Sequence, residues 1–289
     1  FVFVNCMDNN SELSVGDDEY YLTTSWWTTH SIIQSVDNSR VLYLIQEDER
    51  KFYPFGDELF LCSQLLHDNN IKFIVNSQLL YNYFLSEGFE NFKNQGIWFE
   101  PSFPKSIFYY DTDIKREKKN FFFYARPSNT RNLFYLGVRV INKALETGIL
   151  DPDNWTINFV GKDMKSMSFF DTIIPNVYQN LPWDEYANIV RKMDLGLSLM
   201  FTPHPSYPPL DLAASGAIAV TNRYGNKQNL DVYSKNILCC DLNEDALLEG
   251  IKYGVALSSN LDQRLKNYNE NSISSDWTGS FKNVLNSLE

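Results

Sequence analysis

The sequence predicts an α/β protein of two domains, each with a parallel β-sheet flanked by helices. Three observations support this prediction. Short apolar runs alternate with segments of helical spacing along most of the chain, and strand–helix–strand order is typical of parallel βαβ units. Hydrophobic residues make up 44% of the 289 residues, which is enough to bury a sizeable core. The chain is also longer than one core usually holds, because single cores stop growing at about 250 residues.

The first domain is expected over residues 1–110. Apolar runs at 20–24, 41–46 and 71–75 predict buried strands, and helical spacing predicts helices over 26–36, 57–68 and 77–87. Residues 1–6 also have the pattern of a strand, without an initiator methionine. This first part is short for a complete doubly wound unit, so we expect that the N-terminal domain is incomplete and that residues precede it. The boundary falls after Pro101 and Pro104, before the charged run 111–119.

The second domain, residues 111–289, repeats the alternation as a complete doubly wound unit. Strands are predicted at 121–125, 157–160, 195–200, 217–221 and 237–240. Helices are predicted at 131–146, 184–192, 209–215, 243–257 and 279–288. The last helix is a candidate to cross back to the first domain.

Charge and residue usage exclude several classes of function. The net charge of −11 argues against a nucleic-acid-binding face, which must be basic. It argues only weakly against lipid docking, because a local basic patch escapes the count, so peripheral membrane association stays open. No apolar run approaches the ~20 residues of a membrane span. The four cysteines form no CxxC pair, and the three histidines have no HExxH spacing. These counts predict reduced cysteines, a cytoplasmic location and no bound metal; oligomeric state is not indicated.

Residues 200–216 (MFTPHPSYPPLDLAASG) form the most informative segment. They follow a predicted strand and open a helix, where open α/β sheets bind ligands. Pro208 and Pro209 suit a first helical turn, whose free N–H groups bind a diphosphate. We expect Asp211 within that turn, where its carboxylate accepts hydrogen bonds from ribose hydroxyls. A carboxylate that merely complements the helix N-terminus is an equal alternative.

This segment resembles the donor-binding element of retaining GT-B glycosyltransferases, written E-x7-E and followed by a helix of small residues. More narrowly, residues 204–211 (HPSYPPLD) resemble bacterial rhamnosyltransferases of surface-layer glycan synthesis, which use dTDP-rhamnose. The likeness extends over roughly residues 20–240 and includes 43–48, 52–54, 124–127, 131–132, 221–222 and 226–227. It implies two Rossmann-like domains that face each other across a cleft.

The resemblance assigns residues to the donor site, with one departure. Eight residues before Asp211 stands Pro203, so the first acid, which usually contacts the transferred sugar, is absent. His204 is the candidate substitute; the alternative is that it only shapes a proline-rich turn. The resemblance places the following residues on the donor nucleotide: Ser206, Tyr207, Pro208, Pro209, Leu210 and Asp211.

Three basic residues and one loop complete the expected donor site. Arg126 ends a strand, and by analogy Arg126 and Arg131 stabilise charge on the diphosphate leaving group. Lys162, at the end of another strand, either points into the cleft or is a solvated turn residue. Asn180 and Leu181 fall in the loop that lines the nucleobase pocket in related enzymes. For the arginines, the alternative is ordinary surface exposure.

The first domain supplies the acceptor-side candidates. Trp26 and Trp27, with His30, follow a strand; the paired tryptophans either stack on an acceptor sugar or belong to the core. Glu47 or Asp48, at the end of the next strand, orients an acceptor hydroxyl or is simply solvated.

The sequence therefore predicts a retaining glycosyltransferase that moves a sugar, L-rhamnose from dTDP-rhamnose, to a glycan acceptor, lipid-linked or free, during surface polysaccharide synthesis. The diphosphate oxygen would help deprotonate the acceptor, and no cofactor or metal is expected. Two alternatives stay open: a transferase that uses a UDP- or GDP-sugar, and a catalytically inactive GT-B domain that binds glycans or acts as a scaffold.

Overall fold

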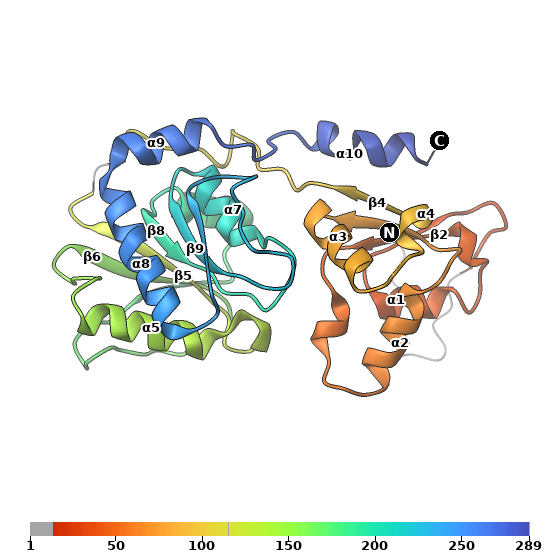
Figure 1. The fold of residues 1–289 in the computed structure, drawn as a ribbon, viewed down its shortest axis with the longest axis horizontal. Helices are drawn as coiled ribbons and strands as arrows, with labels where there is room; N and C mark the ends of the chain where they lie inside the picture. Colours follow the sequence, from red (N-terminus) through yellow and green to blue (C-terminus); the bar gives the residue numbers. More distant parts are fainter. Residues whose placement is uncertain (1–13, 115, 289) are drawn as a thin grey trace.

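The computed structural model describes residues 14–114 and 116–288 as two α/β domains (Figure 1). The strand predicted at residues 1–6 lies outside the described residues. The first domain holds a four-stranded parallel sheet in the order β1-β2-β3-β4. Its strands are β1 (Tyr21–Thr23), β2 (Val41–Ile45), β3 (Lys72–Asn76) and β4 (Gly96–Phe99). The first three were predicted from their apolar runs and β4 was not.

Helices cover this sheet and complete its core. They are α1 (Trp26–Ile32), α2 (Asp57–Leu66), α3 (Gln78–Ser86) and α4 (Phe92–Gln95), with short 3₁₀ turns η1 (Asn38–Arg40) and η2 (Glu49–Phe52). The core is strongly aromatic: the Phe92 ring stacks on Phe73 at 4.5 Å and on Phe84 at 4.9 Å between centroids. Stacked and edge-on aromatic pairs contribute stability beyond the burial of their surface. They therefore help to stabilise the core of this small domain.

The second domain is a six-stranded parallel sheet in the order β10-β9-β8-β5-β6-β7. Its strands are β5 (Lys119–Ala125), β6 (Trp155–Gly161), β7 (Asn176–Gln179), β8 (Leu195–Leu197), β9 (Ile218–Asn222) and β10 (Ile237–Cys240). This is the order of a doubly wound dinucleotide-type sheet. The chain winds outward in one direction from β5 and in the other from β8, so the carboxyl ends of these two strands form the topological switch point.

Helices lie on both faces of this second sheet. They are α5 (Phe134–Glu146), α6 (Trp183–Val190), α7 (Tyr207–Ala214), α8 (Glu244–Ser259) and α9 (Leu261–Asn269), with the 3₁₀ turn η3 (Thr130–Asn132). Residues of α5 and α8 share one core cluster with the sheet, and those of α6 and α7 share another. Gly137 lets α5 approach closely, because a Cβ there would collide with the Phe123 ring. The expected α/β architecture of two parallel sheets is confirmed.

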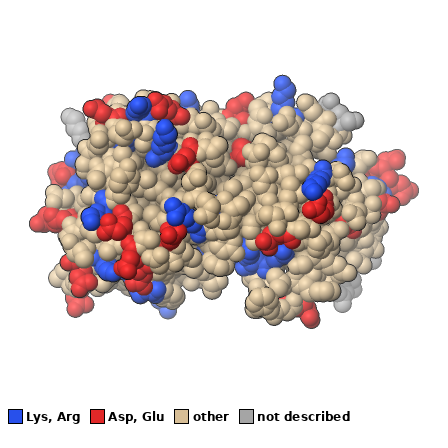
Figure 2. Space-filling model, in the orientation of Figure 1, with Lys and Arg blue, Asp and Glu red and all other residues tan. Residues whose placement is uncertain are grey.

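The last helix, α10 (Trp277–Asn286), belongs in space to the first domain (Figure 1). Its Phe281 ring lies 4.3 Å from that of Phe99 on β4, and Val284 is buried in the same cluster. The chain therefore passes between the domains twice. The two crossings are hydrogen-bonded to each other, because the Phe103 N–H donates to the Ser274 carbonyl at 2.7 Å. Figure 2 shows acidic and basic side chains interspersed over the face in view, without a basic stripe.

Candidate functional site

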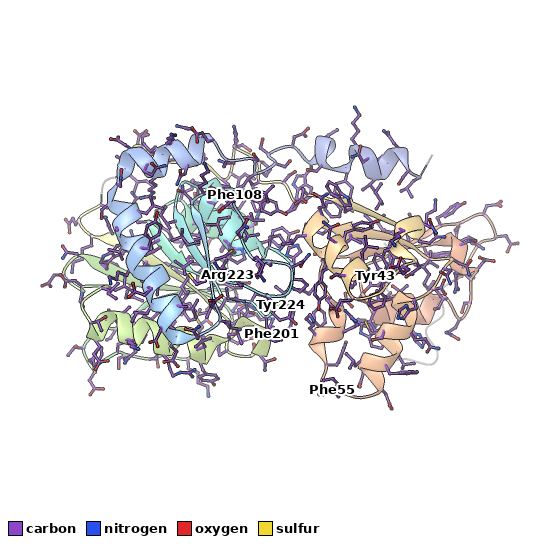
Figure 3. All side chains as sticks on the ribbon, in the orientation of Figure 1. Tyr43, Phe55, Phe108, Phe201, Arg223 and Tyr224 are labelled. Atoms are coloured by element: carbon purple, nitrogen blue, oxygen red, sulfur yellow. The ribbon has the colours of Figure 1, made fainter. Side chains whose placement is uncertain are left out.

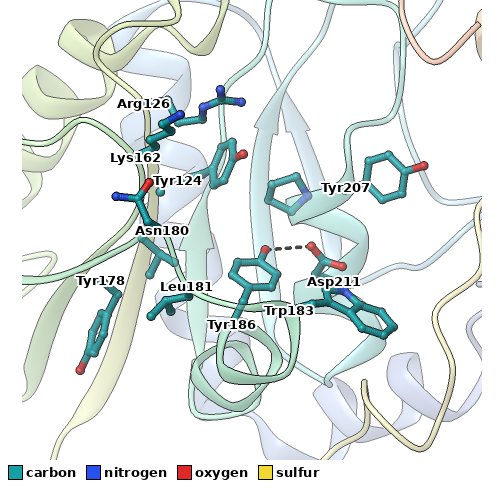
Figure 4. Close-up of a pocket in the computed structure, with 13 residues that line it drawn as sticks. Tyr124, Arg126, Lys162, Tyr178, Asn180, Leu181, Trp183, Tyr186, Tyr207 and Asp211 are labelled. Carbon is teal, nitrogen blue, oxygen red and sulfur yellow. Dashed lines mark hydrogen bonds between the residues drawn. The ribbon is translucent and has the colours of Figure 1, made fainter. Parts of the chain in front are cut away.

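A cavity of about 440 Å³ opens where β5, β6 and α7 meet, at the switch point of the second sheet (Figure 4). Open α/β sheets bind ligands at this position. Its walls are lined by Tyr124, Arg126, Val160, Gly161, Lys162, Tyr178, Asn180, Leu181, Trp183, Tyr186, Tyr207, Pro208 and Asp211. Of the residues predicted to bind the nucleotide, six lie on this list, while Ser206, Pro209 and Leu210 are buried behind it.

One wall of the cavity is cationic. Arg126 follows β5 and Lys162 follows β6, and Figure 4 shows both side chains at the same end of the pocket. The strand ends can approach closely because residue 161 is glycine; a Cβ there would collide with the carbonyl of Ala125. The Arg126 Nε is buried and has no hydrogen-bond partner among the described residues. An unpaired buried donor is costly, and this one suits an anionic ligand.

The opposite wall carries a buried carboxylate. Helix α7 begins at Tyr207, two residues before the predicted start, so Asp211 lies beyond its first turn and not within it as expected. Asp211 is 5% exposed and accepts a hydrogen bond from the Tyr186 hydroxyl at 2.8 Å. Burial raises the pKa of Asp211 to about 7, and the Tyr186 hydrogen bond only partly opposes that shift. Because Asp211 is buried and lies beyond the first turn, it complements the helix N-terminus little. Its binding of ribose hydroxyls stays a prediction.

The loop before α7 is held by its own side chains. His204 N–H donates to Thr202 Oγ1 at 3.0 Å, and Ser206 N–H donates to His204 Nδ1 at 2.9 Å. Burial lowers the pKa of His204 to about 3, so the imidazole is neutral, with its proton on Nε2. That buried Nε2 has no partner in the part of the chain that the structure describes. His204 thus shapes the turn and also keeps one donor free.

The third side of the cavity is the loop before α6. Asn180 adopts a left-handed conformation with φ of 55°, and its N–H donates to the Gly161 carbonyl at 3.1 Å. This turn leads the chain across the mouth of the pocket, where Leu181 and Tyr178 offer apolar surface (Figure 4). Sequence reasoning missed Trp183 and Tyr186 on α6. Their only signal was that two aromatic residues occupy the helix that follows the loop.

Arg131 faces the other domain and is not in the cavity lining. Its Nη1 lies 3.0 Å from Glu47 Oε2, and its guanidinium stacks 4.2 Å from the centre of the Phe52 ring. The Phe201 and Tyr224 rings, 4.5 Å apart, lie at the same boundary (Figure 3). The two Arg131 contacts join the first domain to η3 of the second domain.

The residues predicted to bind the acceptor lie in different environments of the first domain. Trp26 is a core residue that donates to the Tyr53 hydroxyl at 3.0 Å, whereas Trp27 is 47% exposed. His30 lines a small hollow between α1 and α2. Asp48 is completely buried in ion pairs with Arg50 and Lys51, so no surface of its carboxylate is exposed to an acceptor. Its neighbour Glu47 is the one that reaches the second domain.

Two absences hold for the residues described. No cluster of three or more His, Cys, Asp or Glu side chains among them is arranged to hold a metal ion. None of the helices within 14–114 and 116–288 is long and apolar enough to cross a membrane.

Solved structures with the same arrangement of domains are numerous. TarM from S. aureus, solved with UDP, superposes with a TM-score of 0.65 at 11% identity over 92% of this chain and 54% of its own. HepE from Anabaena, solved with UDP and glucose, gives 0.63 at 12% identity over 92% and 77%. Sucrose-phosphate synthase from Thermosynechococcus elongatus gives 0.61 at 12% identity over 93% and 74%. The chain has the GT-B fold of glycosyltransferases.

Sequence comparisons found one matching family and one curated relative. Residues 119–252, most of the second domain, match the family described as the C-terminal domain of WsaF. The O-antigen biosynthesis protein RfbC of Myxococcus xanthus is 26% identical over 247 residues, which cover 81% of this chain. The chain spans only 18% of the length of that relative. The residues that line the cavity of the second domain all lie within residues 119–252.

Proposed function

We propose that this chain is a glycosyltransferase of surface polysaccharide synthesis, with its nucleotide-sugar donor in the cavity of the second domain. The observation that carries the proposal is the arrangement of that cavity. Cationic Arg126 and Lys162 end two adjacent strands, and a buried carboxylate, Asp211, faces them across the switch point. This arrangement fits a nucleoside diphosphate, with the diphosphate at the cations and the ribose diol at the carboxylate.

The base then lies against the loop at Asn180 and Leu181, whose backbone and apolar surface fix no particular nucleobase. Arg126 and Lys162 have a catalytic role in this proposal. Donors fixed beside the leaving diphosphate stabilise its developing charge without reorganisation. His204, neutral and with a free Nε2–H, contributes a hydrogen bond and no charge.

The relatives support the biological setting. RfbC is named for O-antigen biosynthesis, and the motif at residues 204–211 resembles rhamnosyltransferases. We therefore propose dTDP-L-rhamnose as the donor and a surface glycan as the acceptor, with retention of configuration. A UDP-sugar is the second candidate, because TarM and HepE were solved with UDP.

The test is calorimetric titration of dTDP, UDP and GDP into the intact chain and two variants, Arg126→Ala and Asp211→Ala. We expect dTDP to bind best and each variant to lose about tenfold in affinity, the loss of one hydrogen bond to a charged group. Arg139→Ala is the matched control, because Arg139 is exposed and pairs with Glu244 far from the cavity.

Tighter binding of UDP or GDP than of dTDP would refute dTDP-rhamnose as the donor but would still support a glycosyltransferase. Absence of binding by all three nucleotides would reject the transferase and favour a GT-B domain that only binds glycans.

A further inference from the structure

A second group of polar side chains lies beside the nucleotide cavity, at the boundary of the two domains. Glu47 comes from the first domain, and Arg131, Thr202, His204 and Lys227 come from the second. We propose that Glu47 is the carboxylate that binds the hydroxyl groups of the transferred sugar, with Lys227 and His204 as the donors beside it. The inference rests on the proposed function and assigns its sugar subsite.

Glu47 stands where the sequence motif lacks an acid. Its Oε1 accepts a hydrogen bond from the hydroxyl of Thr202, the residue directly before Pro203. Pro203 occupies the first acidic position of E-x7-E, so the opposite domain delivers a carboxylate to the segment from which one is missing. The second oxygen, Oε2, lies 3.0 Å from Arg131 Nη1. The Glu47 side chain keeps 13% of its surface exposed.

Two buried donors near Glu47 have no partner among the described residues: Lys227 Nζ and His204 Nε2. Lys227 is completely buried. Burial lowers the pKa of Lys227 to about 8, and attraction to Glu47 is among the influences that oppose the shift. Lys227 also contributes to the lowered pKa of His204, so all three groups share one electrostatic environment. A buried donor without a hydrogen-bond partner destabilises the folded protein. A ligand that accepts hydrogen bonds from these donors removes that destabilisation.

The hydrogen-bonding groups of Glu47, Lys227 and His204 indicate the class of ligand. The Glu47 carboxylate only accepts hydrogen bonds, whereas the Lys227 ammonium and the His204 Nε2–H only donate them. A neutral polyhydroxylated ring satisfies both kinds at once, because each hydroxyl donates and accepts. A further phosphate would be repelled by Glu47. The region therefore suits the hexose of a nucleotide-sugar, next to the diphosphate at Arg126.

The alternative is that the Glu47–Arg131 pair only holds the domains together. Comparing a nucleoside diphosphate with its sugar conjugate separates the two roles, because only the conjugate reaches the subsite. We would titrate dTDP, dTDP-L-rhamnose, UDP and UDP-glucose into the intact chain and into Glu47→Gln. We expect Glu47→Gln to bind the nucleotide-sugar at least about tenfold more weakly, and the free diphosphate with unchanged or higher affinity because Arg131 is released.

Glu100→Gln is the matched control. Glu100 also joins the two domains, since it accepts from the Tyr233 hydroxyl at 2.7 Å, but it lies outside the cleft group. We expect this variant to leave both affinities within about twofold. A second variant, Lys227→Met, removes an unpaired buried ammonium. It is expected to weaken nucleotide-sugar binding while it raises the melting temperature of the ligand-free protein.

Equal losses for the diphosphate and its sugar conjugate in Glu47→Gln would overturn the inference, because that pattern is expected of domain positioning alone. Unchanged affinity for the conjugate would overturn it as well. If the intact chain binds none of the four nucleotides, the proposed function itself fails, and the subsite with it.

Discussion

Replacement of Asp211 by asparagine is expected to stabilise the protein at alkaline pH and to weaken nucleotide binding. The Asp211 side chain is buried, and among the described residues only the Tyr186 hydroxyl donates a hydrogen bond to it. Asparagine has the same shape and keeps an oxygen for that bond, while its amide takes the place of the other carboxylate oxygen. The variant therefore removes the charge with little change in packing.

The magnitude follows from the pKa of Asp211, which burial raises from 3.8 to about 7. The folded protein binds this proton more tightly than the unfolded chain, so the stability that the group contributes is complete below about pH 4 and is lost as the pH rises through about 7. Three units at ~1.4 kcal/mol each give a loss of about 4 kcal/mol at pH 8. Asparagine avoids this loss. Asp211→Asn should therefore be more stable than the parent by about 4 kcal/mol at pH 8 and by less than about 1 kcal/mol at pH 4.

The assay is urea unfolding of the parent and Asp211→Asn at several pH values between about 4 and 8. Asp153→Asn is the control, because Asp153 is exposed in a turn and its side chain pairs with no charged group within residues 14–114 and 116–288. The same preparations are titrated with the nucleotide that the parent binds best. A stability difference that does not change with pH, or no gain at pH 8, would refute the argument that a buried charge is being removed.

Three further predictions concern how the cavity and the domains are held. Gly161→Ala places a methyl group against the β5 backbone and should lower both the melting temperature and nucleotide affinity, measured on one sample. Arg264→Met removes the nearer charge partner of the buried Asp194 carboxylate, at 2.9 Å, and leaves Arg116 at 3.5 Å; urea unfolding should show a loss of about 3 kcal/mol. Phe281→Ala should cost about 3 kcal/mol by opening a cavity under α10, whereas Leu285→Ala, on the exposed side of that helix, should cost little. Equal losses for the last two would contradict the packing described for α10.

Most strands that were predicted correctly lie inside a parallel sheet and are buried on both faces; the edge strand β1 is the exception. Strands β2 and β5 are continuous apolar runs in the sequence, as burial on both faces requires. Strand β7 was missed because it is an edge strand whose residues are mostly exposed. Helix α9 was missed because the residues it buries, Arg264 and Asn267, are polar. Their burial depends on tertiary hydrogen bonds that no periodicity encodes.

The residues of the candidate site also differ in how well the sequence predicts their positions. The positions of Arg126 and Lys162 follow from strand ends, which local sequence locates well, and Asp211 follows from a motif. The pairing of Arg131 with Glu47 depends on how one domain lies against the other, and the sequence carries no local sign of it. The choice between Glu47 and Asp48 depends on which way each side chain leaves the backbone after β2. Asp48 turns inward to Arg50, and Glu47 turns to the cleft.

The position of α10 has a consequence for the order in which the chain acquires its structure during synthesis. The face of β4 that carries Phe99 is covered by residues 277–286, which the ribosome makes almost 180 residues later. The first domain thus emerges with part of its apolar surface bare, although N-terminal domains usually fold first. The second domain, whose strands and helices all lie between residues 119 and 269, is complete before the first one is. The N-terminal half should therefore stay susceptible to proteases until the last helix has been made.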